Sequence, residues 1–204
     1  MKKLLLAVVA MTMTASAFAA GENMVRLYGW DAGDRGRSFD FSMASDDSDA
    51  AGETSKEQSI VLNYARAFGQ WQVGLVYQSE SSETSTTDNA GSSIGLSGYY
   101  NLNTDLQNTC YFALHYVTHT ASDGSYTSNW TAEGIGEDDS ATSIVLEYGH
   151  RWAIGTGWGF HVTYSPSVMY NMTTYDWDNE ADDDNKGASE TSLAWNFLKF
   201  DVMF

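Results

Sequence analysis

Charged side chains inside otherwise apolar, alternating segments are the first residues in this chain that could do chemistry. In the segment 142–152, Glu147 and Arg151 share one face of an extended chain, and large apolar side chains occupy the other face. Four residues of a strand span about 13 Å, so these two groups cannot pair with each other. Each needs an opposite charge from a neighbouring strand, because an isolated charge in a narrow interior is very costly. The expected network comprises Glu147, Arg151, Lys199, Asp201, Glu80 and Arg66.

Four histidines could also take part in chemistry: His115, His119, His150 and His161. His115 and His119 share a face but lie about 13 Å apart along one strand, too far to chelate one metal ion. A serine hydrolase needs a serine and a carboxylate that converge on one histidine. His161 has Ser165 on its own face and Glu147 on the neighbouring strand, but no nucleophile motif surrounds any serine. We therefore predict no catalytic residue and no metal-binding histidine.

Acidic residues are concentrated in the polar stretches between the alternating segments. The densest stretch, at 176–184, includes Asp176, Asp178, Asp182, Asp183 and Asp184. Carboxylate oxygens at this density suit Ca²⁺ or Mg²⁺, but the spacing and the glycine of an EF-hand loop are absent. We predict no cofactor, and only weak contacts through which divalent cations bridge these loops to lipid phosphates.

The elements that must position these groups are strands, and the last twelve residues give the clearest pattern. Counting back from Phe204, every second residue as far as Leu198 is large and apolar, whereas Lys199 and Asp201 lie between them. In a soluble β-sandwich, a strand ending on Phe204 would expose its ring for no gain. In a membrane barrel, a terminal aromatic ring lies in the interfacial girdle.

Alternating segments recur along the chain, joined by two classes of connection. The segments are 59–68, 71–80, 93–102, 110–120, 142–152 and 158–175. Short connections (69–70, 103–108, 154–157) alternate with long, mostly acidic ones (44–57, 81–92, 121–140, 176–187). Short turns on one side and long loops on the other are typical of outer-membrane barrels. Large rings gather near the short turns and predict an interfacial belt formed by Trp71, Tyr100, Trp152, Trp158 and Phe204.

Residues 1–20 have the pattern of a secretory signal peptide, with Lys2 and Lys3, a short apolar run and a small-x-small site at 17–19. Its removal leaves one domain, residues 21–204. The formal net charge of −17 becomes more negative without the two lysines, which excludes nucleic-acid binding through phosphate neutralisation. The single Cys110 excludes an internal disulfide. No other apolar run is long enough for a membrane helix, so membrane segments must be strands.

The signal peptide, the strand-and-loop rhythm and the terminal Phe204 resemble those of bacterial outer-membrane β-barrel proteins, in the class of the small OmpX/OmpA-type barrels. The resemblance implies an all-β fold, a closed antiparallel up-and-down transmembrane barrel with short periplasmic turns and long acidic extracellular loops. It also implies integral localisation in the outer membrane of a Gram-negative bacterium. The implied partners are membrane lipid, lipopolysaccharide and, through the C-terminal strand, the barrel-assembly machinery. No signature of a single family is present, so no functional residue is carried over.

The number of strands is predicted to be eight, because both chain ends should lie on the periplasmic side, which requires an even number. This count treats 25–30 and 37–43 as one strand and its extension, joined by a kink near Gly33 and Gly36. Ten strands remain open, since the 121–140 stretch, with Tyr126 and Trp130, has room for another hairpin. Pro166 is expected near the outer rim, because a proline fits a closed sheet only at a bulge or beyond the hydrogen-bonded wall.

Alternation alone does not say which face is enclosed, so a soluble β-sandwich or lipocalin-like barrel is the competing fold. The aromatic belt and Phe204 favour the membrane barrel. For function, we predict a structural or surface-interaction barrel whose lumen is plugged by polar side chains. A narrow cation-preferring porin is the alternative, and an outer-membrane lipid or peptide hydrolase is the second alternative.

Overall fold

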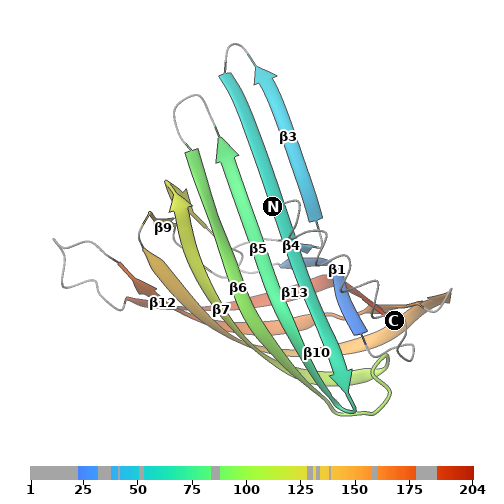
Figure 1. Ribbon diagram of the computed structural model, residues 1–204. Helices are drawn as coiled ribbons and strands as arrows, with labels where there is room; N and C mark the ends of the chain where they lie inside the picture. Colours follow the sequence, from blue (N-terminus) through green and yellow to red (C-terminus); the bar gives the residue numbers. More distant parts are fainter. Residues whose placement is uncertain are drawn as a thin grey trace.

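The computed structural model describes residues 23–31, 38–40, 42–50, 53–83, 88–127, 131, 134–137, 139–157, 160–177 and 188–204. The predicted signal peptide, residues 1–20, lies outside these ranges. The fold is all-β (Figure 1). Its strands are β1 (Asn23–Asp31), β2 (Ser38–Asp40), β3 (Ser42–Ala50), β4 (Glu53–Phe68), β5 (Trp71–Glu83), β6 (Asp88–Asn101), β7 (Thr109–Asp123), β8 (Ser125–Tyr126), β9 (Ile135–Gly136), β10 (Ser140–Gly157), β11 (Phe160–Tyr164), β12 (Ser167–Asp176) and β13 (Ser189–Met203).

The main sheet is antiparallel and its hydrogen-bonded path returns to its start. Neighbours in sequence pair in turn from β4 to β7, then β10 pairs β7 and β12, and β12 pairs β13. The last strand pairs with the first, from Met24↔Met203 to Asp31↔Asn196, and β1 also pairs β4. With β11 and β12 sharing one position, the ring is β1, β4, β5, β6, β7, β10, β11/β12 and β13. This closed up-and-down order confirms the predicted fold class.

Local turn chemistry fixes the end of the barrel that we call the short-turn end. Gly69 and Gln70 join β4 to β5, and Gly69 has φ 65°, a left-handed conformation that glycine adopts without steric cost. Asn101, the last residue of β6, and Leu102 lie at the same end of the barrel. The backbone N–H of Asn101 donates a hydrogen bond to the Gln70 carbonyl at 2.8 Å. The tight turn predicted at 69–70 is confirmed.

The N-terminal part of the wall differs from the prediction. Residues 38–40 do not continue β1 upward; β2 pairs antiparallel with β1, from Tyr28↔Asp40 to Trp30↔Ser38. The 44–57 stretch is not a loop, because β3 and the first half of β4 form a hairpin in register from Ser42↔Val61 to Ala50↔Glu53. In Figure 1 this hairpin lies at the top of the picture and extends well above β1. A ladder satisfies the backbone groups of such a stretch whatever its side chains, which is why polarity alone mispredicted a loop.

Other predicted long loops are also partly strand. β5 and β6 pair as far as Glu83↔Asp88, so most of the 81–92 stretch extends a hairpin. Within 121–140, β8 and β9 form a separate two-stranded sheet through Ser125↔Gly136 and Tyr126↔Ile135. This small sheet adds no crossing to the wall.

The predicted turn at 154–157 and the predicted place of Pro166 are both wrong. β10 continues to Gly157, and β11 pairs back onto it from Trp152↔Tyr164 to Gly157↔Phe160. Pro166 separates β11 from β12 within the wall, where its carbonyl accepts a hydrogen bond from the His150 amide at 3.1 Å. A proline cannot donate to the ladder, and the neighbouring β13 carries an irregularity at this level.

That irregularity is a bulge at Phe197 of β13. Beside β11 and β12 the register runs from Tyr164↔Phe200 to Ser167↔Asn196, so β13 has one residue more than its neighbour in this interval. On the other side, β1 pairs Trp30 with Leu198 and Asp31 with Asn196, and therefore also skips Phe197. Phe197 and Leu198 are both exposed, and the buried positions change from even to odd numbers. The bulge thus sets the phase that turns Lys199 and Asp201 inward.

The side-chain distribution is inverted relative to a water-soluble protein. On β7, Phe112, Leu114 and Tyr116 are about half exposed on the outer surface, whereas His115 and His119 are buried. The same alternation holds on β5, β6 and β10, with exposed leucine, isoleucine and aromatic side chains outside. Large exposed apolar surfaces are rare on monomeric soluble proteins. None of the described residues belongs to a helix long and apolar enough to cross a membrane.

An arginine placed in this outer band should be costly. Leu114, 51% exposed, lies in the middle of the apolar face of β7, and Leu114→Arg should lower the free energy of unfolding by about 2–4 kcal/mol. Urea unfolding of the protein in lipid vesicles measures this change. The control is Thr120→Arg, at an exposed position nearer the long-loop end of the same strand, with an expected loss of about 0–1 kcal/mol. Equal and small losses would mean that the outer face contacts water.

Candidate functional site

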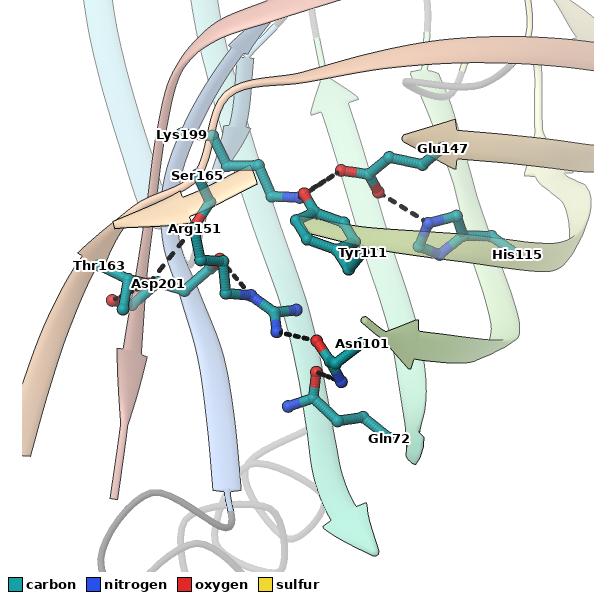
Figure 2. A network of polar contacts seen from close by, with 10 residues as sticks. All are labelled: Gln72, Asn101, Tyr111, His115, Glu147, Arg151, Thr163, Ser165, Lys199 and Asp201. Carbon is teal, nitrogen blue, oxygen red and sulfur yellow. Dashed lines mark hydrogen bonds and ion pairs between the residues drawn. The ribbon is translucent and has the colours of Figure 1, made fainter. Parts of the chain in front are cut away.

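The polar network lies in the barrel interior (Figure 2). It is supplied by the consecutive strands β5, β6, β7 and β10 and by β13, which is separated from β10 by β11 and β12. Its members come from inward positions of β5, β6, β7, β10 and β13 and are each buried. The tyrosine Tyr111 and the basic Lys199 are among the largest fully buried side chains. We call the set Ser97, Tyr111, His115, Glu147 and Lys199 the Glu147 network.

The carboxylate of Glu147, only 2% exposed, is the centre of this network. Its Oε1 accepts a hydrogen bond from the Tyr111 hydroxyl at 2.8 Å and a charged hydrogen bond from Lys199 Nζ. Lys199 Nζ also donates to the Tyr111 hydroxyl oxygen at 2.7 Å. Glu147, Tyr111 and Lys199, from three strands, therefore form a triangle of mutual hydrogen bonds that contains one buried ion pair (Figure 2).

The second oxygen of Glu147 faces a histidine. Oε2 lies 2.9 Å from Nε2 of His115, and Nδ1 of the same ring lies 2.7 Å from the Ser97 hydroxyl. A proton on Nε2 donates to Glu147, and Nδ1 then accepts from Ser97. This order makes a serine–histidine–carboxylate line. The sequence analysis considered His161 and Ser165 for such an arrangement and predicted no catalytic residue. Ser165 instead lies 3.2 Å from the Thr163 hydroxyl.

A second charged group, centred on Arg151, lies nearer the short-turn end. Its guanidinium donates from Nη1 to Asn101 Oδ1 at 2.7 Å, and its Nε is 3.9 Å from Asp201 Oδ2. Asn101 in turn donates to Gln72 at 3.3 Å (Figure 2). The guanidinium carbon also lies 4.4 Å from the centre of the Tyr111 ring, a cation–π contact that links Arg151 to the Glu147 network.

The interior accommodates these large groups because small residues face them. Gly149 occupies an inward position of β10, and a Cβ atom there would collide with the hydroxyl end of Tyr111. The Tyr111 hydroxyl contacts both Glu147 and Lys199. Gly149 therefore makes room for the aromatic ring of Tyr111. Glycine at 149 is therefore a packing requirement of the site.

Four of the six charged residues predicted to form a lumen network, Glu147, Arg151, Lys199 and Asp201, lie buried together in the interior. The structure contradicts the prediction for Arg66. Its neighbours Ala65 and Ala67 are the buried residues of β4, and its guanidinium carbon is 5.7 Å from the ring of Phe68, which is 59% exposed. Arg66 therefore lies on the outer face, because it has the opposite parity to the inward residues of its strand.

Glu80 is also wrongly assigned to this network. It has the inward parity of Gln72 and Gln78 on β5, but it is exposed at the long-loop end, well above Glu147. It lines a small cavity of about 160 Å³ together with Ser82, Asn89, Ala90, Ser125, Tyr126 and Thr127. The alternation along β5 correctly predicted that Glu80 has the inward parity. Glu80 lies too near the long-loop end of β5, however, to contact Lys199 or Asp201.

A second polar cluster, which the sequence reasoning missed, lies nearer the long-loop end. His119 Nδ1 is 2.7 Å from the Ser93 hydroxyl, and its Nε2 is 2.9 Å from the Ser143 hydroxyl. Ser143 continues to Thr173 at 2.8 Å, and Ser93 is 2.9 Å from the hydroxyl of Tyr126. The alternation along β7 indicated that His119 points into the interior. It could not identify the hydrogen-bond partners of His119, because these depend on the register between strands. Both ring nitrogens have hydrogen-bond partners, as expected of a structural histidine.

The aromatic residues predicted for an interfacial belt lie near the short-turn end where they are described. Trp71 and Tyr100 face each other across β5 and β6 with ring centroids 4.8 Å apart. Trp152 stacks on Tyr164 at 5.8 Å, and Phe204 lies 5.9 Å from Phe160. Trp158 lies outside the described residues.

Cys110, to which the sequence assigns no function, and the acidic stretch lie away from the Glu147 network. The Cys110 sulfur lies 3.0 Å from Nδ1 of His150 on the outer-facing side of β7 and β10. Asp176 ends β12 and is exposed, whereas Asp178, Asp182, Asp183 and Asp184 lie outside the described residues. Among the residues that are described, no cluster of three or more histidine, cysteine or acidic side chains could hold a metal ion.

Comparisons with known proteins return structures of the same kind at low similarity. No protein-family model matches the sequence, and no curated protein matches it. Among solved structures, the outer membrane protein OprG from Pseudomonas aeruginosa is 16% identical, with a TM-score of 0.40, over 91% of this chain and 93% of that one. The β domain of the Bordetella autotransporter BrkA is 9% identical, with a TM-score of 0.33, over 91% and 99%.

The chain's own inverted distribution of side chains identifies its class. The antiparallel sheet closes into a ring where β1 pairs with both β13 and β4. Among the described residues, β3 pairs only with β4, and Ser189–Trp195 of β13 pairs only with β12. The outer face of the wall is apolar, and Glu147, Arg151, Lys199 and Asp201 are enclosed. These are the conditions for crossing a bilayer as strands, since lipid offers no hydrogen-bond partner to the backbone. The described structure is therefore that of a β-barrel suited to cross a membrane as strands.

Removing one member of the central ion pair should destabilise the barrel more than removing both. Glu147→Gln leaves Lys199 buried without its counter-charge and should cost about 3–5 kcal/mol of unfolding free energy. The double variant Glu147→Gln/Lys199→Met should recover much of this loss, because no unpaired charge remains. Urea unfolding in lipid vesicles, arranged as a double-mutant cycle, measures the coupling. Additive effects of the two substitutions would contradict a direct interaction.

Proposed function

We propose that this barrel has a structural or surface-interaction role in the outer membrane, with a lumen closed by its own side chains and acidic segments displayed outside. The observation that carries this proposal is the Glu147 network. Lys199, Tyr111 and His115 all direct their polar atoms at one carboxylate instead of lining an open path. Eight-stranded barrels have interiors just wide enough for side chains to fill them.

The charge balance of the described interior also supports a closed barrel. Glu147 is compensated by Lys199, and Asp201 by Arg151. A cation-preferring pore, our alternative function, needs uncompensated acidic groups along its path. Two acidic and two basic side chains give no such preference, so the porin is the weaker candidate.

The long-loop end provides the surface for an external partner. The β3–β4 and β5–β6 hairpins reach far from the short turn between β4 and β5 (Figure 1), and their sequences carry many acidic residues. We expect these segments to meet lipopolysaccharide phosphates through divalent cations, without a fixed cofactor site. At the other end, β13 and its terminal Phe204 are the expected contact with the barrel-assembly machinery.

The serine–histidine–carboxylate line raises the hydrolase alternative again, and its burial argues against it. Ser97 is 2% exposed, and a hydrolase needs its nucleophile open to substrate. Glu147 is also neutralised by Lys199, whereas the acid of a catalytic triad stabilises the positive charge that forms on its histidine. We therefore propose that the protein is not an enzyme and that Ser97 and His115 serve packing.

A closed lumen predicts electrical silence. The mature protein, refolded and inserted in planar lipid bilayers, should give no conductance steps above those of protein-free membranes. Correct folding in the same preparation is checked by the slower migration of an unheated barrel in gel electrophoresis. Reproducible cation-selective steps would replace the structural role with the porin.

A serine-reactive probe separates the structural role from the hydrolase. The folded protein should not be labelled by a fluorophosphonate, because Ser97 is enclosed and its histidine is engaged with Glu147. The matched variant Ser97→Ala gives the background of the labelling assay. Labelling of the wild-type protein that disappears in Ser97→Ala would assign catalysis to this serine.

A further inference from the structure

A layer of apolar side chains crosses the interior between the two polar clusters. Val76, Val117 and Val145 are at most 1% exposed, Met169 is 4% exposed, and the four form one packed cluster with Ala194 against it. They come from β5, β7, β10, β12 and β13 respectively, in the order of the wall. We call these five residues the apolar ring.

The same polar–apolar–polar order recurs on several strands. On β7, Val117 lies between the inward residues His115 and His119. On β10, Val145 lies between Ser143 and Glu147. The apolar ring therefore separates the Glu147 network from the His119 cluster along the barrel axis.

The ring is also closed toward β6, which supplies no side chain at this level. Gly95 of β6 pairs with both Val76 and Val117, and a Cβ atom at Gly95 would come within 2.8 Å of Val117 Cγ2. Val117 thus packs directly against the β6 backbone. On the far side of Val76, β4 supplies the buried Asn63, which is paired with Val76 in register.

The two sides of the ring differ from it in how readily they can take up water. On the periplasmic side, Asn196 and Ser167 are buried, and neither the amide of Asn196 nor the hydroxyl of Ser167 has a hydrogen-bond partner among the described residues. Such groups bind water readily. The five side chains of the apolar ring offer water no partner, although the Asn63 amide oxygen beside Val76 has no hydrogen-bond partner among the described residues. Hydrophobic constrictions block conduction by staying dry.

We propose that the apolar ring is the permeation barrier of this barrel, excluding inorganic ions and small hydrophilic solutes, whereas the ion pairs beneath it hold the wall together. This inference rests on the proposed closed lumen and names the residues that close it. An ion would have to leave the polar groups on either side and pass five apolar side chains, with the Asn63 amide the described polar group at that level. The Glu147 network fills the lumen beneath the ring, but its polar groups can replace part of an ion's hydration shell, so the ring is the stricter barrier to ions.

The test compares two substitutions that remove almost the same volume and differ in polarity. The full mature chain with Val117→Ser/Val145→Ser is inserted in planar bilayers in KCl, beside Val117→Ala/Val145→Ala. We expect discrete conductance steps for the serine pair and a loss of those steps in the alanine pair, because an enlarged but apolar layer stays dry. Equal conductance of the two variants would overturn the proposal in favour of simple packing volume.

A third variant keeps the ring and breaks the ion pair. Glu147→Gln/Lys199→Met should remain silent, since Val117 and Val145 are intact. Conductance of this variant together with silence of the serine pair would overturn the proposal and assign the barrier to the Glu147 network. Slower migration of the unheated protein verifies folding of every variant. Conductance of the wild-type protein would instead contradict the proposed closed lumen itself, so the two failures are distinguishable.

Discussion

A carboxylate can stay ionised inside a narrow barrel only if cations and hydrogen-bond donors surround it. Glu147 meets this condition through side chains that lie far apart in sequence: Lys199 on β13, and Tyr111 and His115 on β7. These contacts require three features of the wall at once. β10 must lie beside β7, β13 must reach the same interior, and the phase of β13 must turn Lys199 inward. The bulge at Phe197 supplies the last of these.

Much of the wall was predictable because strand side chains alternate. Counting back from Phe204 correctly placed Lys199 and Asp201 opposite the apolar face. The same rule correctly placed Glu147 and Arg151 on one face of β10. That rule could also have excluded Arg66, which has the parity of the outer residues of β4. It could not show that Glu80 lies too high, since height depends on how strands are staggered.

The remaining differences between the predicted and the observed structure come from the register between strands, from the bulge in β13 and from strand pairing in polar stretches. The contact of His115 with both Glu147 and Ser97 depends on pairing between β6, β7 and β10, which the residues of one segment do not encode. Pro166 was expected beyond the wall but lies within it, beside the strand that bulges at Phe197. Polar stretches such as 44–57 form hairpins because strand pairing satisfies the backbone whatever the side chains are.

The interior is organised in layers of polar and apolar side chains along the barrel axis. The Arg151 group and the Glu147 network tie the wall together near the short-turn end, the apolar ring packs across the middle, and the His119 cluster contacts Tyr126 of β8. Small inward residues make this stacking feasible, as Gly149 does for Tyr111 and Gly95 for Val117. The barrel interior is therefore a packed core that alternates in polarity, enclosed by an apolar surface.

The most direct test of this account is a solid-state NMR distance between the Lys199 side-chain nitrogen and the Glu147 carboxyl carbon, measured in lipid bilayers with ¹⁵N-labelled lysine and ¹³C-labelled glutamate. A buried Lys199–Glu147 ion pair should give a strong dipolar correlation between these two atoms, with a Glu147 signal insensitive to a water-soluble paramagnetic ion. A Glu147 carboxyl without that correlation, and broadened by the paramagnetic ion, would show a charge exposed to bulk water and contradict the account.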